Sequence, residues 1–193
     1  MADASKTSSR SRTRLTSSAA LQAGQDRFVA LWGDMGSSWG IPRTMAEVHA
    51  LLYINADPMS ADDIAQRLSI SRGSVSMTLR SLMDWGIVQR THRRGERREY
   101  FRAEQDVWEM FRIILRERKR REIDPVLVAL YECRDLTSPE RVTDARDARL
   151  GDHNARLDRM LEMIELIDRL AGRFVAPAGK GLRFAATVLG KAI

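Results

Sequence analysis

The chain has 193 residues, of which 44% are hydrophobic and 30% charged, a composition typical of one globular domain with extensions. It contains no apolar run of the roughly 18 residues that a membrane span requires, and its N-terminus lacks the apolar stretch of a signal peptide. The single cysteine, Cys133, cannot form an intramolecular disulfide. We therefore expect a cytoplasmic protein without membrane segments.

The positive charge is concentrated in one part of the chain. There are 32 Lys and Arg residues against 26 Asp and Glu residues, which gives a net charge of +6. Residues 71–121 contain fourteen basic and seven acidic residues, so their surplus alone exceeds that net charge. Such a local positive field indicates a polyanionic partner, most simply nucleic acid, although charge alone does not distinguish DNA, RNA and anionic lipid.

The chain begins with residues 1–18, which are rich in Ser, Thr and Arg and predict a disordered basic arm. Residues 19–40 then carry apolar side chains at spacings of three, four and seven, which predicts a helix that ends in a cluster of glycines and serines. A second helix is expected after Pro42, where Thr44 and Glu47 have the spacing of a capping box.

Two further helices follow closely. Ser60 and Asp63 have the spacing of another capping box and predict a short third helix. Ser71 is placed to cap a fourth helix, and Gly86 lies where a left-handed residue would end it. Because only a tight turn separates the third helix from the fourth, the pair has the form of a helix-turn-helix.

A basic hairpin completes this unit. Segments 87–92 and 98–102 have a strand-like period and are joined by an Arg-rich turn containing Gly95. Helix, tight turn, helix and basic hairpin together predict a winged helix-turn-helix domain over residues 41–103. In such a domain the second helix enters the major groove of DNA and the hairpin, or wing, contacts the neighbouring backbone.

The predicted fourth helix has a buried side and a DNA-facing side. Its apolar residues Val75, Leu79 and Leu82 share one side. The candidate DNA-binding residues on the other side are Ser71, Arg72, Gly73, Ser74, Ser76, Met77, Thr78 and Arg80. Those of the wing are Arg93, Arg94, Gly95, Arg97 and Arg98. Arginine can donate to guanine edges or to phosphates, and short hydroxyl side chains permit close approach.

Residues 104–172 are expected to form linker and dimerisation helices. Pro125 should kink or restart the first of them, and Ser138 with Pro139 should open the last. That last helix has a near-heptad apolar stripe made of Leu150, Leu157, Met160, Leu161, Ile164, Ile167 and Ala171. The stripe could pack within one subunit, but we favour a homodimer because winged helices of this type bind two half-sites. Residues 116–121 are interpreted as a salt-bridged helical stretch in preference to a direct DNA contact, and residues 173–193 have no assigned structure.

Other kinds of site have weaker support. An aromatic cage around a quaternary ammonium effector could be built from Trp32, Trp39, Tyr53, Trp108 and Tyr131, with core packing as the alternative. The candidate effector residues among them are Trp32, Tyr53 and Trp108. The three histidines are scattered without metal-ligand spacing, so no metal site is expected. Phosphate-binding loops and nucleophile elbows are also missing. The sequence therefore predicts neither an enzyme nor a cofactor.

Four motifs resemble the GbsR branch of the MarR-type transcriptional regulators. They are Gly40-x-Pro42, Ser69-x-Ser71-Arg72-Gly73-Ser74-Val75-Ser76, Gly95-Glu96-Arg97-Arg98-x-Tyr100-Phe101 and Arg121-Glu122-Ile123-x-Pro125. The resemblance implies a mainly α-helical homodimer with a small β-hairpin wing, dimerised by residues 19–40 and 104–172. It also implies binding to palindromic double-stranded DNA, usually repression, and in some members a response to choline or glycine betaine. The alternatives are a winged-helix module for protein interaction and a non-specific nucleoid-binding module.

Overall fold

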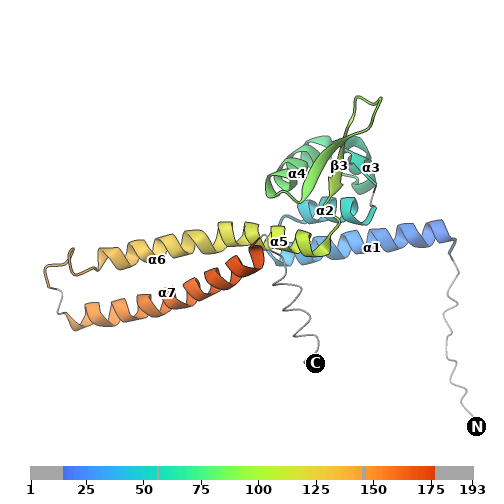
Figure 1. The fold of residues 1–193 in the computed structure, drawn as a ribbon. Coiled ribbons are helices and arrows are strands. Elements are labelled where there is room, and N and C mark those ends of the chain that lie inside the picture. Colours follow the sequence, from blue (N-terminus) through green and yellow to red (C-terminus); the bar gives the residue numbers. More distant parts are fainter. Residues whose placement is uncertain (1–14, 56, 145–146, 177–193) are drawn as a thin grey trace, which may run out of the picture.

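The computed structural model describes residues 15–55, 57–144 and 147–176 (Figure 1). It is mainly helical with a small antiparallel sheet, which confirms the predicted fold class. The predicted arm at 1–18 and tail at 173–193 lie largely outside the described residues. The elements are α1 (Ser17–Ser38), α2 (Arg43–Asn55), β1 (Met59–Ser60), α3 (Ala61–Leu68), α4 (Arg72–Trp85), β2 (Val88–His92), β3 (Glu99–Ala103), α5 (Val107–Arg118), η1 (Lys119–Ile123), α6 (Asp124–Leu136) and α7 (Ala148–Val175).

A winged helix-turn-helix domain is built from α2, α3, α4 and a sheet with strand order β1-β3-β2. The hairpin of β2 and β3 is in register from Val88 opposite Ala103 to His92 opposite Glu99. The two-residue strand β1, which the sequence did not predict, pairs with β3 across the domain. Apolar side chains from the three helices and the sheet fill one core, so the hairpin projects from a rigid base (Figure 1).

The caps of α3 and α4 confirm the local sequence signals. The Ser60 hydroxyl accepts from the backbone N–H of Asp63 while the Asp63 carboxylate accepts from the N–H of Ser60, which completes the capping box. The Ser71 hydroxyl accepts from the N–H of Ser74 at 3.1 Å. At the other end of α4, Gly86 has a φ of 80°, which L side chains rarely adopt. These caps determine where α4 begins and ends.

The capping box predicted for α2 was wrong. The carbonyl of Pro42 already accepts from the N–H groups of Met45 and Ala46, so the helix begins at Arg43. Thr44 therefore lies inside the first turn, where its side chain cannot act as a cap. Glu47 instead accepts from Arg43 Nε at 2.7 Å.

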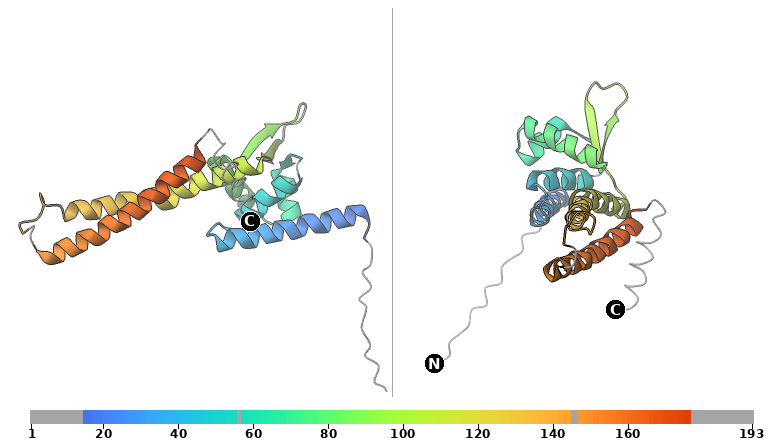
Figure 2. Two further views of the ribbon diagram at one scale, coloured as in Figure 1. Left: turned by 60° about the horizontal axis from the view of Figure 1, so that its bottom comes forward. Right: turned by 90° about the vertical axis from the view of Figure 1, so that its left-hand side faces the viewer.

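Helix α1 runs alongside α2 and ends within the predicted cluster of glycines and serines, although it continues past Gly36 (Figure 2). Gly36 is buried within the helix, and a Cβ atom built there would lie 2.5 Å from the Cβ of Ala46. The glycine therefore permits close contact between α1 and α2. The helix ends at Ser38, two residues before the left-handed Gly40.

The helices α5, η1 and α6 form one long rod that leaves the winged domain (Figure 1). The segment η1 is π-helical, and the N–H of Asp124 donates to the carbonyl of Lys119, five residues earlier. Pro125 has no N–H and its ring conflicts with a carbonyl four residues earlier in a regular α-helix. The wider turn relieves this conflict, in agreement with the break expected at Pro125.

Helix α7 packs antiparallel to α6, and the two form a C-terminal hairpin (Figures 1 and 2). The predicted start of the last helix at Ser138 and Pro139 was wrong, because α7 begins at Ala148. Ser138 and Pro139 lie in a turn, in which the N–H of Ser138 donates to the carbonyl of Asp135. Asp147 caps α7 by accepting from the N–H of Arg149 at 2.8 Å.

The apolar stripe of α7 divides into two faces. Leu161 and Ala171 are buried against the neighbouring helices, whereas Met160 and Ile167 are exposed. The stripe thus packs within the chain on one side and leaves apolar side chains uncovered on the other. In the described ranges, no helix combines the length and apolar character needed to span a membrane.

Candidate nucleic-acid interface

Helix α4 separates its core residues from its candidate DNA-binding residues. Val75, Leu79 and Leu82 are buried, as predicted. The exposed candidates are Ser71, Arg72, Gly73, Ser76, Met77 and Arg80, and the half-buried ones are Ser74 and Thr78. Met77 is 66% exposed, unusually high for a large apolar side chain in a folded domain. The outer face of α4 therefore offers hydroxyl, guanidinium and thioether groups to a partner.

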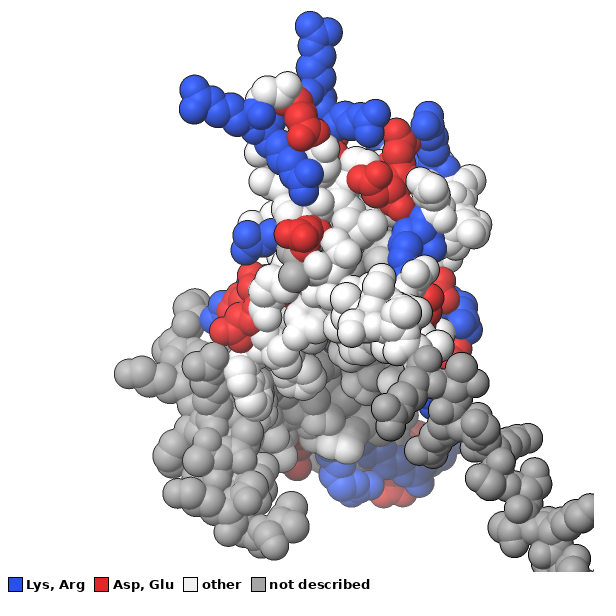
Figure 3. All heavy atoms as spheres, turned by 90° about the vertical axis from the view of Figure 1, so that its right-hand side faces the viewer, with Lys and Arg blue, Asp and Glu red and all other residues white. Residues whose placement is uncertain are grey.

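The wing presents arginines around a tight turn. Gly95 has a φ of 86°, and the N–H of Glu96 closes the turn on the carbonyl of Arg93. The side chains of Arg94, Arg97 and Arg98 are exposed. Figure 3 shows Lys and Arg side chains projecting at the wing end of the domain, with acidic side chains between them. A projecting basic hairpin of this kind can reach phosphates beside a groove.

Arg93 has a different arrangement from the other wing arginines. Its guanidinium lies 4.4 Å from the centre of the Tyr100 ring, and its Nη2 donates to the Pro58 carbonyl at 3.3 Å. The Tyr100 hydroxyl in turn donates to Glu96, which raises the pKa of the tyrosine. Arg93 therefore fastens the wing to the loop before β1, so it positions the neighbouring arginines.

The outer face of α4 and the wing meet in one depression. Ser76 and Arg80 from α4 and Arg90 and Arg98 from the wing line this depression, whose volume is about 330 Å³. Four residues from two separate segments of the sequence thus share a single surface. A nucleic acid lying on this surface would contact the helix and the wing together.

Two arginines of this surface already have acidic partners. Arg72 Nε lies 2.9 Å from Asp62, and Arg90 Nη1 lies 2.7 Å from Glu99. Both pairs are exposed, so each contributes little stability and can be exchanged for a phosphate or base contact. Within the described ranges, Arg80, Arg94 and Arg97 have no ion-pair partner, so their guanidinium groups are available at the surface.

The acidic cap of α3 lies close to this positive surface. The Ser60 hydroxyl and backbone N–H donate to Asp63 and lower the pKa of its carboxyl group. The positive charges of Arg98 and Arg93 act in the same direction. Asp63 therefore stays ionised and strengthens the start of α3, where a negative charge is favourable.

In the basic run 116–121, every basic residue except Arg116 forms an ion pair among the described residues. Glu117 is buried and lies 2.7 Å from Arg120 and 3.8 Å from Arg121. Lys119 lies 2.6 Å from Asp124 and 2.7 Å from Asp168, and these two carboxylates raise its pKa. These contacts agree with the salt-bridged interpretation of the run. They also connect η1 to α7.

The three candidate effector residues do not form one site. Trp32 lies in an aromatic group with Phe28, His49 and Tyr53, and ring centres in this group are 5.6 to 6.5 Å apart. Trp32 also lines an apolar pocket, whereas Tyr53 and Trp108 do not. The structure therefore separates Trp108 from the other two candidates.

Two residues at these surfaces were missed from the sequence. Arg90 follows the strand pattern, so its place beside Arg80 could be found only from the register of β2 and β3. Trp85 lies at the last residue of α4, three residues after the buried Leu82, and this helical spacing could have placed it inside. It lines the same pocket as Trp32.

Several known proteins are similar to this chain. Residues 39–99 match the MarR family. The chain is 26% identical over 114 residues to the HTH-type transcriptional repressor GbsR of Bacillus subtilis (strain 168), covering 59% of this chain and 63% of GbsR. It is 23% identical over 91 residues to the putative HTH-type transcriptional regulator YvaV of the same organism, covering 47% of this chain and 51% of YvaV. The chain thus spans between half and two thirds of the length of these relatives.

One solved structure has a similar fold over most of the chain. It is described as the crystal structure of a transcriptional regulator, with a TM-score of 0.50 and 23% sequence identity. The superposition covers 79% of this chain and 95% of the other. This likeness extends beyond the winged domain to the helices that flank it.

Proposed function

We propose that this protein, whose residues 39–99 match the MarR family, is a winged helix-turn-helix regulator that binds a palindromic DNA operator as a homodimer and represses transcription. The observation that carries the proposal is the single depression shared by Ser76 and Arg80 of α4 and Arg90 and Arg98 of the wing. The relatives named above are transcriptional regulators, which agrees with the expectation that the chain is not an enzyme. The protein would then act in the cytoplasm, where it binds the chromosome.

In this proposal α4 lies in the major groove. Arg72 and Arg80 donate to base edges, and Arg72 exchanges its contact with Asp62 for one with DNA. The hydroxyls of Ser71, Ser74 and Ser76 contact base edges or phosphates near the positive end of the helix. The wing arginines Arg94, Arg97 and Arg98 contact the flanking backbone.

The proposed homodimer is supported by apolar side chains that one copy leaves uncovered. In the described part of α1, α6 and α7 these are Leu21, Leu31, Val126, Val128, Leu136, Met160, Met163, Leu166, Ile167 and Leu170. A second copy provides an identical surface to cover them, and a two-fold dimer presents two copies of α4 to two half-sites about 34 Å apart. Residues 19–40 and 104–172 would thus dimerise, and residues 41–103 would bind DNA.

The test is binding of the full chain to fragments of its own genome at physiological salt, including the DNA upstream of its gene. We expect a short inverted repeat bound with strong preference over random DNA. Arg72→Ala and Arg80→Ala should each weaken operator binding by about 1–3 kcal/mol and relax sequence preference. Arg97→Ala should weaken binding to all DNA and reduce the dependence of affinity on salt.

A matched control comes from the basic run on α5. Arg116 is exposed and has no ion-pair partner among the described residues, so Arg116→Ala removes the same charge away from the proposed interface. It should leave operator affinity within about twofold. Equal affinity for operator and random DNA would favour the nucleoid-binding alternative, and absence of DNA binding would favour a protein partner. The choline or glycine betaine response expected from the resemblance stays a prediction.

A further inference from the structure

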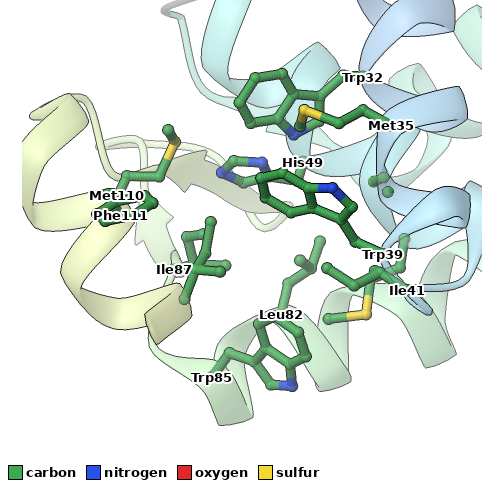
Figure 4. A pocket seen from close by; sticks show the side chains of 14 residues that line it. Trp32, Met35, Trp39, Ile41, His49, Leu82, Trp85, Ile87, Met110 and Phe111 are labelled. Carbon is green, nitrogen blue, oxygen red and sulfur yellow. The ribbon is translucent and has the colours of Figure 1, made fainter. Parts of the chain in front are cut away.

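The first turn of α5 carries an exposed apolar patch made of Val107, Trp108 and Phe111, called here the α5 patch. Val107 is 49% exposed, Trp108 40% and Phe111 41%, and residues three and four apart are neighbours on a helix surface. Phe111 also lines the apolar pocket that contains Trp32 (Figure 4), whereas Val107 and Trp108 lie outside that pocket. Exposed apolar side chains that lie next to each other mark a surface for another segment or molecule.

Helix α7 packs on the same side of α5 farther along the rod. Lys119, which follows the last turn of α5, lies 2.7 Å from Asp168 of α7. Trp108 and Lys119 are about three helical turns apart, so they lie on the same side of the rod. Arg112 and Leu115 lie on this side between them and are half-buried, whereas Trp108 is exposed. This pattern indicates that α7 covers the side and stops short of Trp108.

The end of α7 lies close to the α5 patch. Helix α7 is antiparallel to the rod, so from Asp168 to its last residue, Val175, it runs back along α5 (Figure 1). This stretch of helix rises by about 10 Å, which brings Val175 to the level of Arg112, about one turn from Trp108. Residues 177–193 follow, outside the described residues. Five extended residues can span roughly 17 Å, so residue 182 is within reach of the patch.

Residues 182–193 have the sequence pattern of an amphipathic helix. Arg183, Thr187 and Lys191 recur every four residues and define one polar stripe. Leu182 and Leu189 share the opposite side of such a helix, which is apolar. A helix of this length is marginal in water by itself. Its apolar side therefore needs a surface to cover it.

The charges of the two segments are complementary. Residues 177–193 contain three basic residues and no acidic residue. Residues 104–112, which surround the α5 patch in sequence, contain three acidic residues and one basic residue. Opposite charges beside an apolar contact favour the correct partner and orientation.

We propose that residues 182–193 dock as an amphipathic helix on the α5 patch of the same chain. The end of α7 about one turn from Trp108 assigns the patch to this segment. Docked there, the segment connects the C-terminal hairpin to the winged domain, because α5 begins shortly after β3. The proposal does not depend on DNA binding, so the proposed function can fail without affecting it.

Disulfide cross-linking tests the contact. Val107→Cys is combined with Leu189→Cys in a full chain whose native cysteine is removed by Cys133→Ser, and mild oxidation traps the contact. We expect a cross-link within one chain, identified by mass spectrometry of the monomer. Thr187→Cys in place of Leu189→Cys puts the thiol on the polar stripe. It should cross-link about tenfold more slowly, because a disulfide requires the two Cα atoms to lie within roughly 7 Å. Equal rates for the two pairs would overturn the proposal.

Val128 provides a matched control surface. It is 57% exposed on α6, and the extended chain between Val175 and Leu189 is long enough to reach it. Val128→Cys with Leu189→Cys should cross-link no faster than the Thr187 pair. Equal cross-linking to Val107 and Val128 would mean that the segment has no preferred surface and would overturn the proposal. Cross-links between two chains would show that a second copy covers the patch and would overturn the assignment to the same chain.

Hydrogen exchange of the full chain measures docking without added thiols. We expect the amides of residues 183–193 to be protected in the wild-type chain. Leu189→Glu should lower this protection about tenfold, because it places a charge against the apolar patch. Thr187→Glu adds the same charge on the polar stripe and should change the protection by at most about twofold.

A substitution in the patch completes the test. Trp108 lies outside the buried core, so Trp108→Ala should leave the winged domain folded and lower the protection of residues 183–193 as much as Leu189→Glu does. Protection that persists in Trp108→Ala would place the segment on another surface and overturn the proposal. Amides that are unprotected in the wild-type chain would also overturn it.

Discussion

The winged domain and the C-terminal hairpin bury their apolar residues to very different extents. In the domain, Val48, Leu52, Ile64 and Val75 are fully buried in one core shared by helices and sheet. In the hairpin, α6 has no buried residue and α7 has Leu161 and Ala171 only. Two antiparallel helices cannot surround each other's apolar faces. The domain therefore buries its apolar residues within itself, whereas the hairpin needs another surface to cover its apolar residues.

This difference indicates which part of the molecule controls which property. A closed core determines the folding stability and the shape of the DNA-binding surface. An open apolar face determines association, because its free energy is gained only when a partner covers it. Substitutions in the two regions should thus change different measurements even when the residue types are the same.

The largest effect is expected for Leu52→Ala in the domain. The side chain of Leu52 is 0% exposed, so truncation leaves a cavity and should lower the free energy of unfolding by about 2–5 kcal/mol. Chemical denaturation followed by circular dichroism measures this. A loss below about 1 kcal/mol would mean that the core is less closed than described, and the comparison with the hairpin would fail.

Acid should destabilise the domain through His49. Burial lowers the pKa of His49 to about 4 from an ordinary value of 6.5, so the unfolded state binds a proton more readily than the folded state. The contribution of neutral His49 to the free energy of unfolding is therefore fully present above pH 6.5. It falls by about 3 kcal/mol as the pH drops to about 4. Denaturation at several pH values should show this fall in wild type and a smaller fall in His49→Phe. Parallel pH profiles for the two would contradict the assignment.

Helix α1 packs tightly against α2 at Gly36 and has open space around Gly24. A Gly-to-Ala substitution at each position tests this difference. A Cβ at Gly36 would overlap the Cβ of Ala46, so Gly36→Ala should destabilise the chain by about 1–3 kcal/mol. Gly24 has no neighbouring atom within 4 Å, so Gly24→Ala should stabilise α1 by up to about 1 kcal/mol. Thermal unfolding of the two variants should move in opposite directions. A destabilised Gly24→Ala would reveal an unexpected contact at the start of α1.

Substitutions on the exposed face of the C-terminal hairpin should change dimerisation. Leu166 is 51% exposed on α7, so Leu166→Ala should weaken dimerisation about tenfold, or about 1.4 kcal/mol. Sedimentation equilibrium measures the dimer dissociation constant. Met77→Ala removes an apolar side chain that is even more exposed, at 66%, from α4 and should leave the dimer dissociation constant unchanged. If both variants dimerise like wild type, this face of α7 does not form the interface.

The sequence predicted those features that short local patterns determine. The caps Ser60 and Ser71 and the left-handed Gly86 act within a few residues, so their patterns can be recognised directly. The same kind of pattern failed at Thr44 and Glu47, because the carbonyl of Pro42 had already started α2. A capping pattern shows that a helix can begin at that position. Whether the helix begins there depends on the residues that precede it.

Features that depend on distant residues could not be predicted. In the sequence, Arg93 cannot be distinguished from the other arginines of the wing. Its contacts with Tyr100 and Pro58 exist only once β1 pairs with β3. The pocket likewise needs Trp32 and Trp85 from two helices more than fifty residues apart in sequence. Helical periodicity can place each of them on an inward side of its helix, whereas the empty space between them results from tertiary packing.

The π-helical turn η1 sets the rotational phase of the whole C-terminal hairpin. One extra residue in a helix rotates every later side chain by about 100° around the axis. Deleting one residue between Lys119 and Ile123 would therefore rotate α6, and with it the packed α7, by about 100° relative to α5 without changing the composition of either helix. The length of η1 thus specifies which apolar residues are available for self-recognition, and homologues that differ there by one residue should not exchange subunits with this chain.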